Sequence, residues 1–307
     1  MDPILSTIFR VSINPSTTFL EYSLAAIKEA WAPITPSLNY DQYKKEGALL
    51  LKQRVNCGFS NFPNIGGNPA TRLKIQAPES DEEVFLEANW VADDKIATGY
   101  PSVGKMANTY WYCLERLNET RSVIIVNLMA SKDVNASYGM FLPTKEGCIV
   151  GEKGLLTDKP HGKWMRKVSL VKESCYGDWS HLEIDVGDSK ISGYYFPTWK
   201  DHADAETEIV AAMIKAIFIE MQGKPNPIIV VNCRAGVGRT GTLLTSLHFY
   251  QMIQGGEKDP SKYTLEAIVT VINEFREKRG EAQFVQTASQ FFMLCRLIQK
   301  FYNQKFS

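Results

Sequence analysis

The sequence lacks several features that mark particular classes of protein. No apolar run approaches the length of about 20 residues that a membrane-spanning helix needs, and the N-terminus lacks the basic-then-apolar pattern of a secretory signal. The 34 basic residues balance the 34 acidic ones, so no overall positive field attracts nucleic acid. We therefore expect neither a membrane span nor a nucleic-acid partner, and any attraction for phosphate has to be local.

Cysteine is scarce and widely scattered. The six cysteines show no close pairing of the kind that binds metal, so we expect no metal site and no cofactor. Several of them lie in apolar contexts, which favours reduced, buried thiols and fits a reducing compartment. We therefore expect a cytoplasmic protein.

The pattern of apolar residues predicts the fold class. Hydrophobic residues make up 44% of the sequence and charged residues 22%, which is typical of a globular protein with ample material for a core. Apolar, β-branched runs predict a buried strand at 122–128 and three further strands between residues 164 and 196. Helical spacing predicts helices at 104–117, 203–222, 238–253, 262–279 and 286–302. Together these elements predict an α/β fold in which a central mixed, twisted sheet is flanked by helices on both faces.

The N-terminal part differs from the rest of the chain. Residues 1–55 are predicted to form a helical cap or extension in two pieces, 19–31 and 40–54, with prolines between them. Residues 56–80 are rich in Asn, Gly and Pro and are predicted to be loop-like. We expect residues 56–307 to form the main domain, and the two parts to make one structural unit.

The most informative segment is a predicted strand, loop and helix. An apolar, β-branched run ends at Cys233, a short loop containing Gly236 follows, and a helix opens near Gly238. Converging N–H groups in such a loop form a nest for an anion, and the positive end of the helix dipole adds to it. Arg239 is placed to bind two phosphate oxygens through its guanidinium. The same field favours an ionised Cys233 sulfur, a nucleophile aimed at the bound phosphate.

This loop resembles the signature of the protein tyrosine phosphatase superfamily, in which a cysteine and five further residues precede an arginine and a serine or threonine. Here it reads Cys233-Arg234-Ala235-Gly236-Val237-Gly238-Arg239-Thr240. The resemblance implies that the five residues after Cys233 bind the phosphate and that the hydroxyl of Thr240 donates to the sulfur. One alternative is a buried cysteine beside an ordinary strand-to-helix turn. The other is a rhodanese-like sulfur carrier, whose loop need not end in arginine and threonine.

The family places a general acid on a mobile loop before the cysteine, ordinarily spelled Trp-Pro-Asp. An acid is needed because a phenolate is a poor leaving group near neutral pH. This chain has Trp199-Lys200-Asp201, so the resemblance gives the acid role to Asp201 and the hinge-anchor role to Trp199. Lys200 replaces the proline and predicts a more mobile loop. The alternative is a surface loop with a packed tryptophan and a solvated aspartate.

A second motif concerns hydrolysis of the phosphorylated cysteine. The family positions a water with a Gln-Thr-x-x-Gln pattern, which here begins at Gln286 and ends at Gln290. The resemblance implies that Gln286 orients the water and that Gln290 supports the rim of the pocket. The alternative for both glutamines is capping of a helix start.

Pocket depth would decide which phosphorylated residue can bind. Tyrosine-specific members have a tyrosine ten residues before an Arg-x-Lys strand, and counting back from Arg72 gives Phe62. Asn64 falls where the family has an aspartate that fixes the main chain of the substrate. A deep pocket walled by an aromatic ring would admit phosphotyrosine and exclude phosphoserine. The alternative is that Phe62 packs beneath its own loop.

Two residues beside the reactive cysteine also differ from the family or add to it. The residue before the cysteine is usually histidine in the family, and here it is Asn232, whose side chain can supply similar hydrogen bonds. Arg234 adds positive charge at the mouth of the pocket, unless it is simply solvated. We expect activity to survive the replacement at position 232.

The resemblance extends over residues 40–303 and is strongest toward the C-terminal end. It implies a protein tyrosine phosphatase that acts on phosphotyrosine-containing proteins through a phosphocysteine intermediate. Three alternatives stay open. These are a phosphatase for phosphoinositides or small phosphoesters, a phosphotyrosine-binding pseudophosphatase, and an adaptor whose N-terminal helices bind a partner. Lys200 and Asn232 motivate the pseudophosphatase. The divergent N-terminal half and the short arginine-bearing loop resemble bacterial members, some of which are delivered into a host cytoplasm.

Overall fold

The structure is a computed structural model. It describes residues 21–31, 57–58, 67–76, 83–101, 105–130, 141–143, 149–150 and 166–307. Within these residues, no helix is both long enough and apolar enough to cross a membrane.

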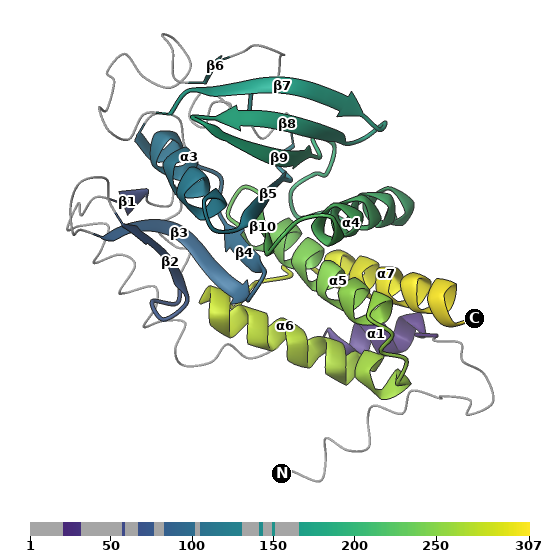
Figure 1. Cartoon of the computed structure of the whole chain (residues 1–307). Helices are drawn as coiled ribbons and strands as arrows, with labels where there is room; N and C mark the ends of the chain where they lie inside the picture. Colours follow the sequence, from purple (N-terminus) through teal and green to yellow (C-terminus); the bar gives the residue numbers. More distant parts are fainter. Residues whose placement is uncertain are drawn as a thin grey trace.

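A ten-stranded mixed sheet forms the centre of the molecule (Figure 1). Its strands are β1 (Cys57–Gly58), β2 (Arg72–Gln76), β3 (Glu83–Ala92), β4 (Lys95–Thr98), β5 (Ser122–Asn127), β6 (Ile149–Val150), β7 (Val168–Cys175), β8 (Ser180–Val186), β9 (Ser189–Tyr195) and β10 (Pro227–Asn232). The order across the sheet is β1-β3-β4-β10-β5-β9-β8-β7-β6, with β2 paired to β3. β10 pairs in parallel with β4 and β5, whereas β7, β8 and β9 form an antiparallel meander.

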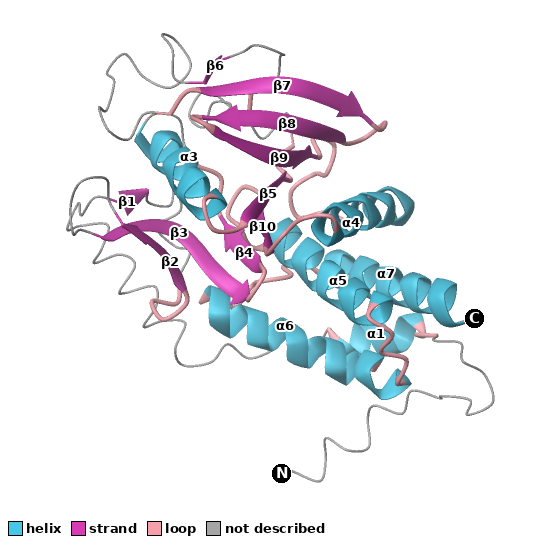
Figure 2. Cartoon of the chain, in the orientation of Figure 1, coloured by secondary structure: helices cyan, strands magenta, loops and turns pink. Residues whose placement is uncertain are grey.

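Helices cover both faces of the sheet, as the sequence predicts (Figure 2). They are α1 (Leu24–Ala30), α3 (Lys105–Asn118), α4 (Thr207–Gln222), α5 (Gly238–Gln254), α6 (Leu265–Arg279) and α7 (Ala288–Phe306). α3 lies on one face, and α4, α5, α6 and α7 lie on the other. The predicted α/β class is therefore confirmed.

Strand β10 shows why the sheet needs helices on both sides. Ile229 and Val231 pack in the core shared with α4, α5 and α7, whereas Ile228 and Val230 pack in the core shared with α3. Successive side chains of a strand point to opposite faces, so an unbroken apolar run is stable only where both faces are covered. This burial fixes β10 at the middle of the sheet, and Cys233 follows its last residue.

The helix predicted at 203–222 begins later than expected, at Thr207. The carbonyl of Ala203 accepts a hydrogen bond from the indole of Trp199, at 2.9 Å, and Glu206 is in an extended conformation at the N-cap. Residues 203–206 therefore belong to the turn that closes the preceding loop.

Capping residues also move the starts of two later helices. The helix predicted from residue 262 begins at Leu265, because the Thr264 side chain caps its first turn. The helix predicted from residue 286 begins at Ala288, after Thr287 at the N-cap. A threonine whose hydroxyl accepts a hydrogen bond from a backbone N–H of the first turn has an extended backbone itself, so the helix starts at the next residue.

The prediction that residues 56–80 are loop-like is wrong for β1 and β2, whereas the Arg-x-Lys strand that the resemblance implies at Arg72 is present as β2. This strand pairs antiparallel with β3, and neither β3 nor β4 was among the predicted strands. Only Leu73 is buried in β2, so the segment carries little of the apolar pattern by which strands are predicted. The residues that pair with β2 belong to β3, which lies further along the chain.

The described part of the predicted N-terminal cap is residues 21–31. Helix α1 packs against α6 and α7, and the hydroxyl of Tyr22 donates to the carbonyl of Tyr263, at 2.5 Å. The ring centroids of Trp31 and Phe291 lie 5.4 Å apart. The helix predicted at 40–54 lies outside the described residues, and the division of the chain at residue 55 stays a prediction.

Candidate active site

The predicted phosphate loop lies between β10 and α5, in the expected strand–loop–helix arrangement. Cys233 follows the last residue of β10 and is 2% exposed, and α5 begins at Gly238. The residue at the N-cap, Val237, has an apolar side chain and therefore cannot cap the first turn. The first N–H groups of an α-helix have no partner inside the helix, so they can bind an anion here.

Two glycines allow other parts of the chain to approach this loop closely. Gly236 has a φ of 70°, and a Cβ atom there would lie 2.3 Å from the carbonyl oxygen of Thr98. A Cβ atom on Gly238 would lie 3.0 Å from the amide oxygen of Gln286 and from both amide atoms of Gln290. A side chain at either position would therefore push away a wall of the loop. The two predicted glutamines lie against the loop, as the Gln-Thr-x-x-Gln pattern requires.

Arg239 connects the phosphate loop to the predicted acid loop. Its side chain is fully buried, and Nη1 donates to the carbonyl oxygens of Leu128, at 2.9 Å, and Trp199, at 2.8 Å. Nη2 donates to Oδ1 of Asp201 at 2.9 Å, in an ion pair. The structure thus brings together the predicted arginine, the predicted acid and the predicted hinge anchor.

The segment from Trp199 to Ala203 forms a compact turn over this ion pair. The Trp199 side chain is buried and its indole closes the turn on Ala203, whereas Lys200 is exposed. Oδ2 of Asp201 lies 3.8 Å from the guanidinium of Arg234 and 3.7 Å from Nε2 of His202. Arg234 therefore extends toward the acid, so that one exposed and one buried arginine lie beside the same carboxylate.

Gln290 links the acid loop to the segment that contains Gln286. Its buried amide oxygen accepts from the backbone N–H of Gln286, at 2.9 Å, and of Thr287, at 3.3 Å. Its Nε2 donates to the carbonyl of Ala203 at 3.4 Å. The capping alternative is correct for Gln290, which forms a capping box with Thr287, and the same side chain also holds the acid loop. The half-buried Gln286 donates to Gln283 at 3.2 Å.

Several predicted site residues keep their roles as predictions. The Thr240 hydroxyl is buried and has no hydrogen-bond partner within the described residues, which include Cys233, so the structure does not contain the predicted bond to the sulfur and the role stays a prediction. Phe62 and Asn64 lie outside the described residues. Val237 is buried, and the carbonyl of Ala235 accepts from Arg279 at 3.5 Å.

Arg279 is a loop contact that the sequence did not reveal. This fully buried residue at the end of α6 donates to the carbonyls of Gly236, at 3.3 Å, and Ala235. It also donates to Oδ1 of Asn89, at 2.8 Å, and pairs with Glu87 at 3.3 Å. Basic residues are common in the last turn of any helix, so nothing in the sequence distinguished this one. Arg279 ties the phosphate loop to β3.

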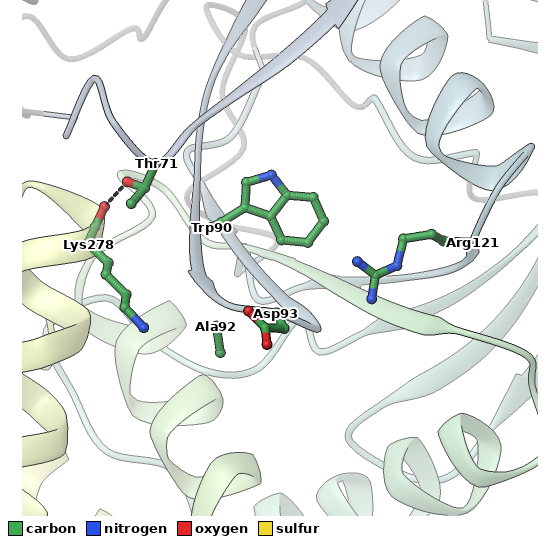
Figure 3. Close-up of a pocket in the computed structure, with 6 residues that line it drawn as sticks. All are labelled: Thr71, Trp90, Ala92, Asp93, Arg121 and Lys278. Atoms are coloured by element: carbon green, nitrogen blue, oxygen red, sulfur yellow. Dashed lines mark hydrogen bonds between the residues drawn. The ribbon is translucent and has the colours of Figure 1, made fainter.

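A groove on another part of the surface contains none of these residues (Figure 3). It has a volume of about 400 Å³ and is lined by Thr71, Trp90, Ala92, Asp93, Arg121 and Lys278. The guanidinium of Arg121 lies 5.5 Å from the centroid of the Trp90 ring. Its lining includes no cysteine, histidine or other predicted nucleophile, so the groove is not the candidate active site.

Comparison with known proteins agrees with the resemblance found in the sequence. The family model described as protein-tyrosine phosphatase matches residues 59–300. Human tyrosine-protein phosphatase non-receptor type 7 is 25% identical over 247 residues, which cover 76% of this chain and 61% of that protein. Tyrosine-protein phosphatase 1 of Caenorhabditis elegans is 22% identical over 272 residues, covering 85% of this chain and 25% of that protein. Tyrosine-protein phosphatase 1 of Saccharomyces cerevisiae is 29% identical over 114 residues, 34% of this chain and 33% of that protein. The chain thus spans less than two thirds of the length of these relatives.

Proposed function

Because the chain belongs to the protein-tyrosine phosphatase family, we propose that it hydrolyses phosphotyrosine in proteins through a phosphocysteine intermediate. One observation carries the proposal: the loop that holds Cys233 ends in a buried arginine that contacts both the predicted acid, Asp201, and the backbone of Trp199. We assign catalysis to residues 56–307, with residues 1–55 as an N-terminal extension. The buried free thiols of Cys113, Cys233 and Cys295 favour a reducing compartment such as a cytoplasm.

Phosphate binding would use one edge of the Arg239 guanidinium. Nη1 is held by the carbonyls of Leu128 and Trp199, which fixes the plane of the group. We assign the opposite edge, formed by Nε and Nη2, to two oxygens of the phosphate, since a guanidinium binds such a pair in a bidentate manner. A phosphate oxygen on Nη2 takes the place of Oδ1 of Asp201. Binding therefore releases the Asp201 carboxylate from Arg239, so that it takes up a proton from solvent and faces the leaving oxygen.

In the first chemical step, the Cys233 sulfur attacks phosphorus in line with the tyrosyl oxygen. The S–P bond forms as the bond between phosphorus and the tyrosyl oxygen breaks, and protonated Asp201 gives its proton to that oxygen. Loop N–H groups and Arg239 hold the charge on the three equatorial oxygens. The products are tyrosine and phosphocysteine.

The second step hydrolyses phosphocysteine and restores the enzyme. A water oriented by Gln286 attacks phosphorus, its proton passes to the Asp201 carboxylate, and the S–P bond breaks to leave the thiolate and inorganic phosphate. Gln290 supports this step because it holds both the Gln286 backbone and the acid loop at Ala203. Thr240 is assigned to donate to the departing sulfur.

Two other functions fit parts of the same site. A phosphatase for phosphoinositides would be favoured by a strongly basic loop, but Arg234 is the only basic residue in the loop besides Arg239. A phosphotyrosine-binding pseudophosphatase would be favoured by the replacements Lys200 and Asn232. The contact between Arg239 and Asp201 favours catalysis instead, because it keeps acid and anion site together.

The test is turnover of a phosphotyrosine peptide, a phosphoserine peptide and a phosphoinositide by wild type, Cys233→Ser and Cys175→Ser. Cys175 is exposed on β7, so its variant controls for the loss of a thiol elsewhere. We expect wild type and Cys175→Ser to hydrolyse the phosphotyrosine peptide fastest, and Cys233→Ser to be inactive but to bind it. Binding without turnover in wild type would establish the pseudophosphatase, and a preference for the phosphoinositide would establish the lipid phosphatase.

A further inference from the structure

Two asparagines meet where β10 and β5 end beside the phosphate loop. In the parallel pairing of these strands, Asn232 lies opposite Asn127, and both residues are buried, at 0% and 1% exposure. Nδ2 of Asn232 donates to Oδ1 of Asn127 at 3.0 Å. The same oxygen accepts from the backbone N–H of Met129 at 2.9 Å. Since a backbone N–H can only donate, this second bond fixes which end of the Asn127 amide faces Asn232.

This amide pair is not explained by stability. Within the described part of the chain, Nδ2 of Asn127 and Oδ1 of Asn232 have no hydrogen-bond partner, and both atoms are buried. A buried donor or acceptor without a partner destabilises the folded state, and two apolar side chains of similar size would avoid that cost. A buried pair that costs stability calls for another explanation, and fixing a neighbouring group in place is one.

The backbone around Asn127 reaches the reactive groups by three routes. The N–H of Leu128 donates to the carbonyl of Asn232 at 2.8 Å, directly before Cys233. The carbonyl of Leu128 accepts from Nη1 of Arg239 at 2.9 Å. The carbonyl of Asn127 accepts from the N–H of Phe196 at 2.9 Å, on the segment that leads to the acid loop. Residues 127–129 therefore contact the phosphate loop at both of its ends and the start of the acid loop.

We propose that Asn127 is a positioning residue of the phosphatase reaction. Through its bonds with Asn232 and Met129, its side chain sets where the nucleophile at the start of the loop lies relative to the guanidinium at its end. The proposal deepens and rests on the proposed function. A displacement of about 1 Å between reacting groups can cost about 100-fold in rate, so loss of this bond should lower turnover without removing any group that touches the phosphate.

The test is a double-mutant cycle measured with a phosphotyrosine peptide. We expect Asn127→Leu and Asn232→Leu each to lower kcat by about 10- to 100-fold while KM changes by less than about threefold. We expect the double variant to lose no more than either single variant, because both substitutions remove the same bond. Losses that multiply in the double variant would overturn the proposal, as would an unchanged kcat in both single variants.

Two further variants separate positioning from stability. In Asn232→His an imidazole N–H can still donate to Oδ1 of Asn127, so this variant should keep kcat within about threefold of wild type. Asn108→Leu replaces a buried asparagine of α3 and serves as the matched control. Equal losses in kcat for Asn108→Leu and Asn127→Leu would overturn the proposal. If Asn127→Leu does not fold, the two Asn232 variants decide. A low kcat in Asn232→Leu with a wild-type kcat in Asn232→His supports the proposal, and equal kcat values in these two variants overturn it.

The same set of variants distinguishes the proposal from the function on which it rests. No turnover of any phosphorylated substrate by wild type and by Asn108→Leu would reject the proposed function. Turnover by both, together with unaltered rates in the Asn127 and Asn232 variants, would reject only the positioning role.

Discussion

Buried polar groups lie at both ends of the central strands. They differ in how far their hydrogen-bonding atoms are satisfied. At the amino end of β4, buried Lys95 donates to Asp94, at 2.6 Å, and to Gln251. Gln251 completes the cluster by donating to the second carboxylate oxygen of Asp94 at 2.8 Å. At the carboxyl ends of β10 and β5, by contrast, amide atoms of Asn127 and Asn232 have no partner within the described residues.

This difference separates a structural cluster from a reactive one. Polar groups that satisfy one another stabilise a fold, whereas a buried pair with unpartnered atoms costs stability and is proposed here to position the groups that react. Substitutions at the amino end should therefore change stability and leave the rate intact, and substitutions at the carboxyl end should change the rate. The predictions below test this contrast from the largest expected effect to the smallest.

Replacing the predicted acid should give the largest effect at the reactive end. We expect Asp201→Ala to lower kcat by about 100- to 10,000-fold, because general acid catalysis contributes that much, and to retain a phosphotyrosine peptide. Asp204→Ala is the matched control, since Asp204 is an exposed aspartate of the same loop. Steady-state kinetics and a pull-down with the peptide would check both. Equal rates for the two variants would remove Asp201 from the mechanism.

Breaking the cluster at the amino end should give a large effect on stability alone. Asp94→Asn leaves the Lys95 ammonium, which is 2% exposed, without its counter-charge. We expect a loss of about 3 kcal/mol in the free energy of unfolding, measured in urea, with kcat unchanged. The control is Glu183→Gln, which breaks an exposed pair with Lys172 and should cost less than about 1 kcal/mol. A fall in kcat for folded Asp94→Asn would break the contrast between the two ends.

Arg279 lies at the reactive end without being assigned to touch the substrate. We expect Arg279→Met to lower kcat by about 10- to 100-fold, because the loop carbonyls of Gly236 and Ala235 lose their donor and the loop shifts. Lys278→Met, at the exposed neighbouring position, should behave like wild type in the same assay. Similar rates in the two variants would show that the loop keeps its shape without this contact.

The last prediction is a gradual pH dependence, and it concerns a histidine near the amino-end cluster. Burial, with a further contribution from nearby Lys95, lowers the pKa of His248 to about 4 from its usual 6.5. The unfolded chain therefore binds a proton between pH 6.5 and 4 that the folded chain does not, and the stability contributed by neutral His248 is lost as pH falls through this window. The slope is at most about 1.4 kcal/mol per pH unit.

A comparison with His248→Phe isolates this contribution. The ring packs against Phe249 and Phe275, so phenylalanine keeps the aromatic contacts. Urea unfolding at several pH values should show a shallower loss of stability in the variant between pH 6.5 and 4. The pKa of Glu220 is lowered to about 2, so its own contribution is lost only below about pH 4.5. Parallel curves for wild type and variant would exclude His248 as the source.

Those parts of the reactive end that consist of consecutive residues could be predicted from the sequence. The apolar run of β10, the glycines of the loop and the start of α5 are consecutive, so strand, loop and helix could be read together. The acid and glutamine motifs are short and lie at fixed places relative to Cys233. The structure brings Asp201, Arg239 and Gln290 to one place, although their catalytic roles stay predictions.

What the sequence could not reveal depends on distant partners. Arg279 looks like any basic residue at a helix end until β3 supplies Asn89 beside it. Asn127 is one polar residue at the end of a strand until the register of β5 and β10 places it opposite Asn232. Strand β2 has a single buried side chain and little apolar pattern, so only the family resemblance indicated it, and helix starts depended on which threonine acts as a cap.

The most direct test of the central claim is to trap the phosphorylated enzyme. Wild type and Gln286→Ala would be mixed with a ³²P-labelled phosphotyrosine peptide, quenched in acid within milliseconds, digested, and examined by mass spectrometry for a phosphorylated peptide. The account predicts label on Cys233 alone, with more of it in Gln286→Ala because hydrolysis is slowed. Release of phosphate without any labelled Cys233 in either protein would contradict it.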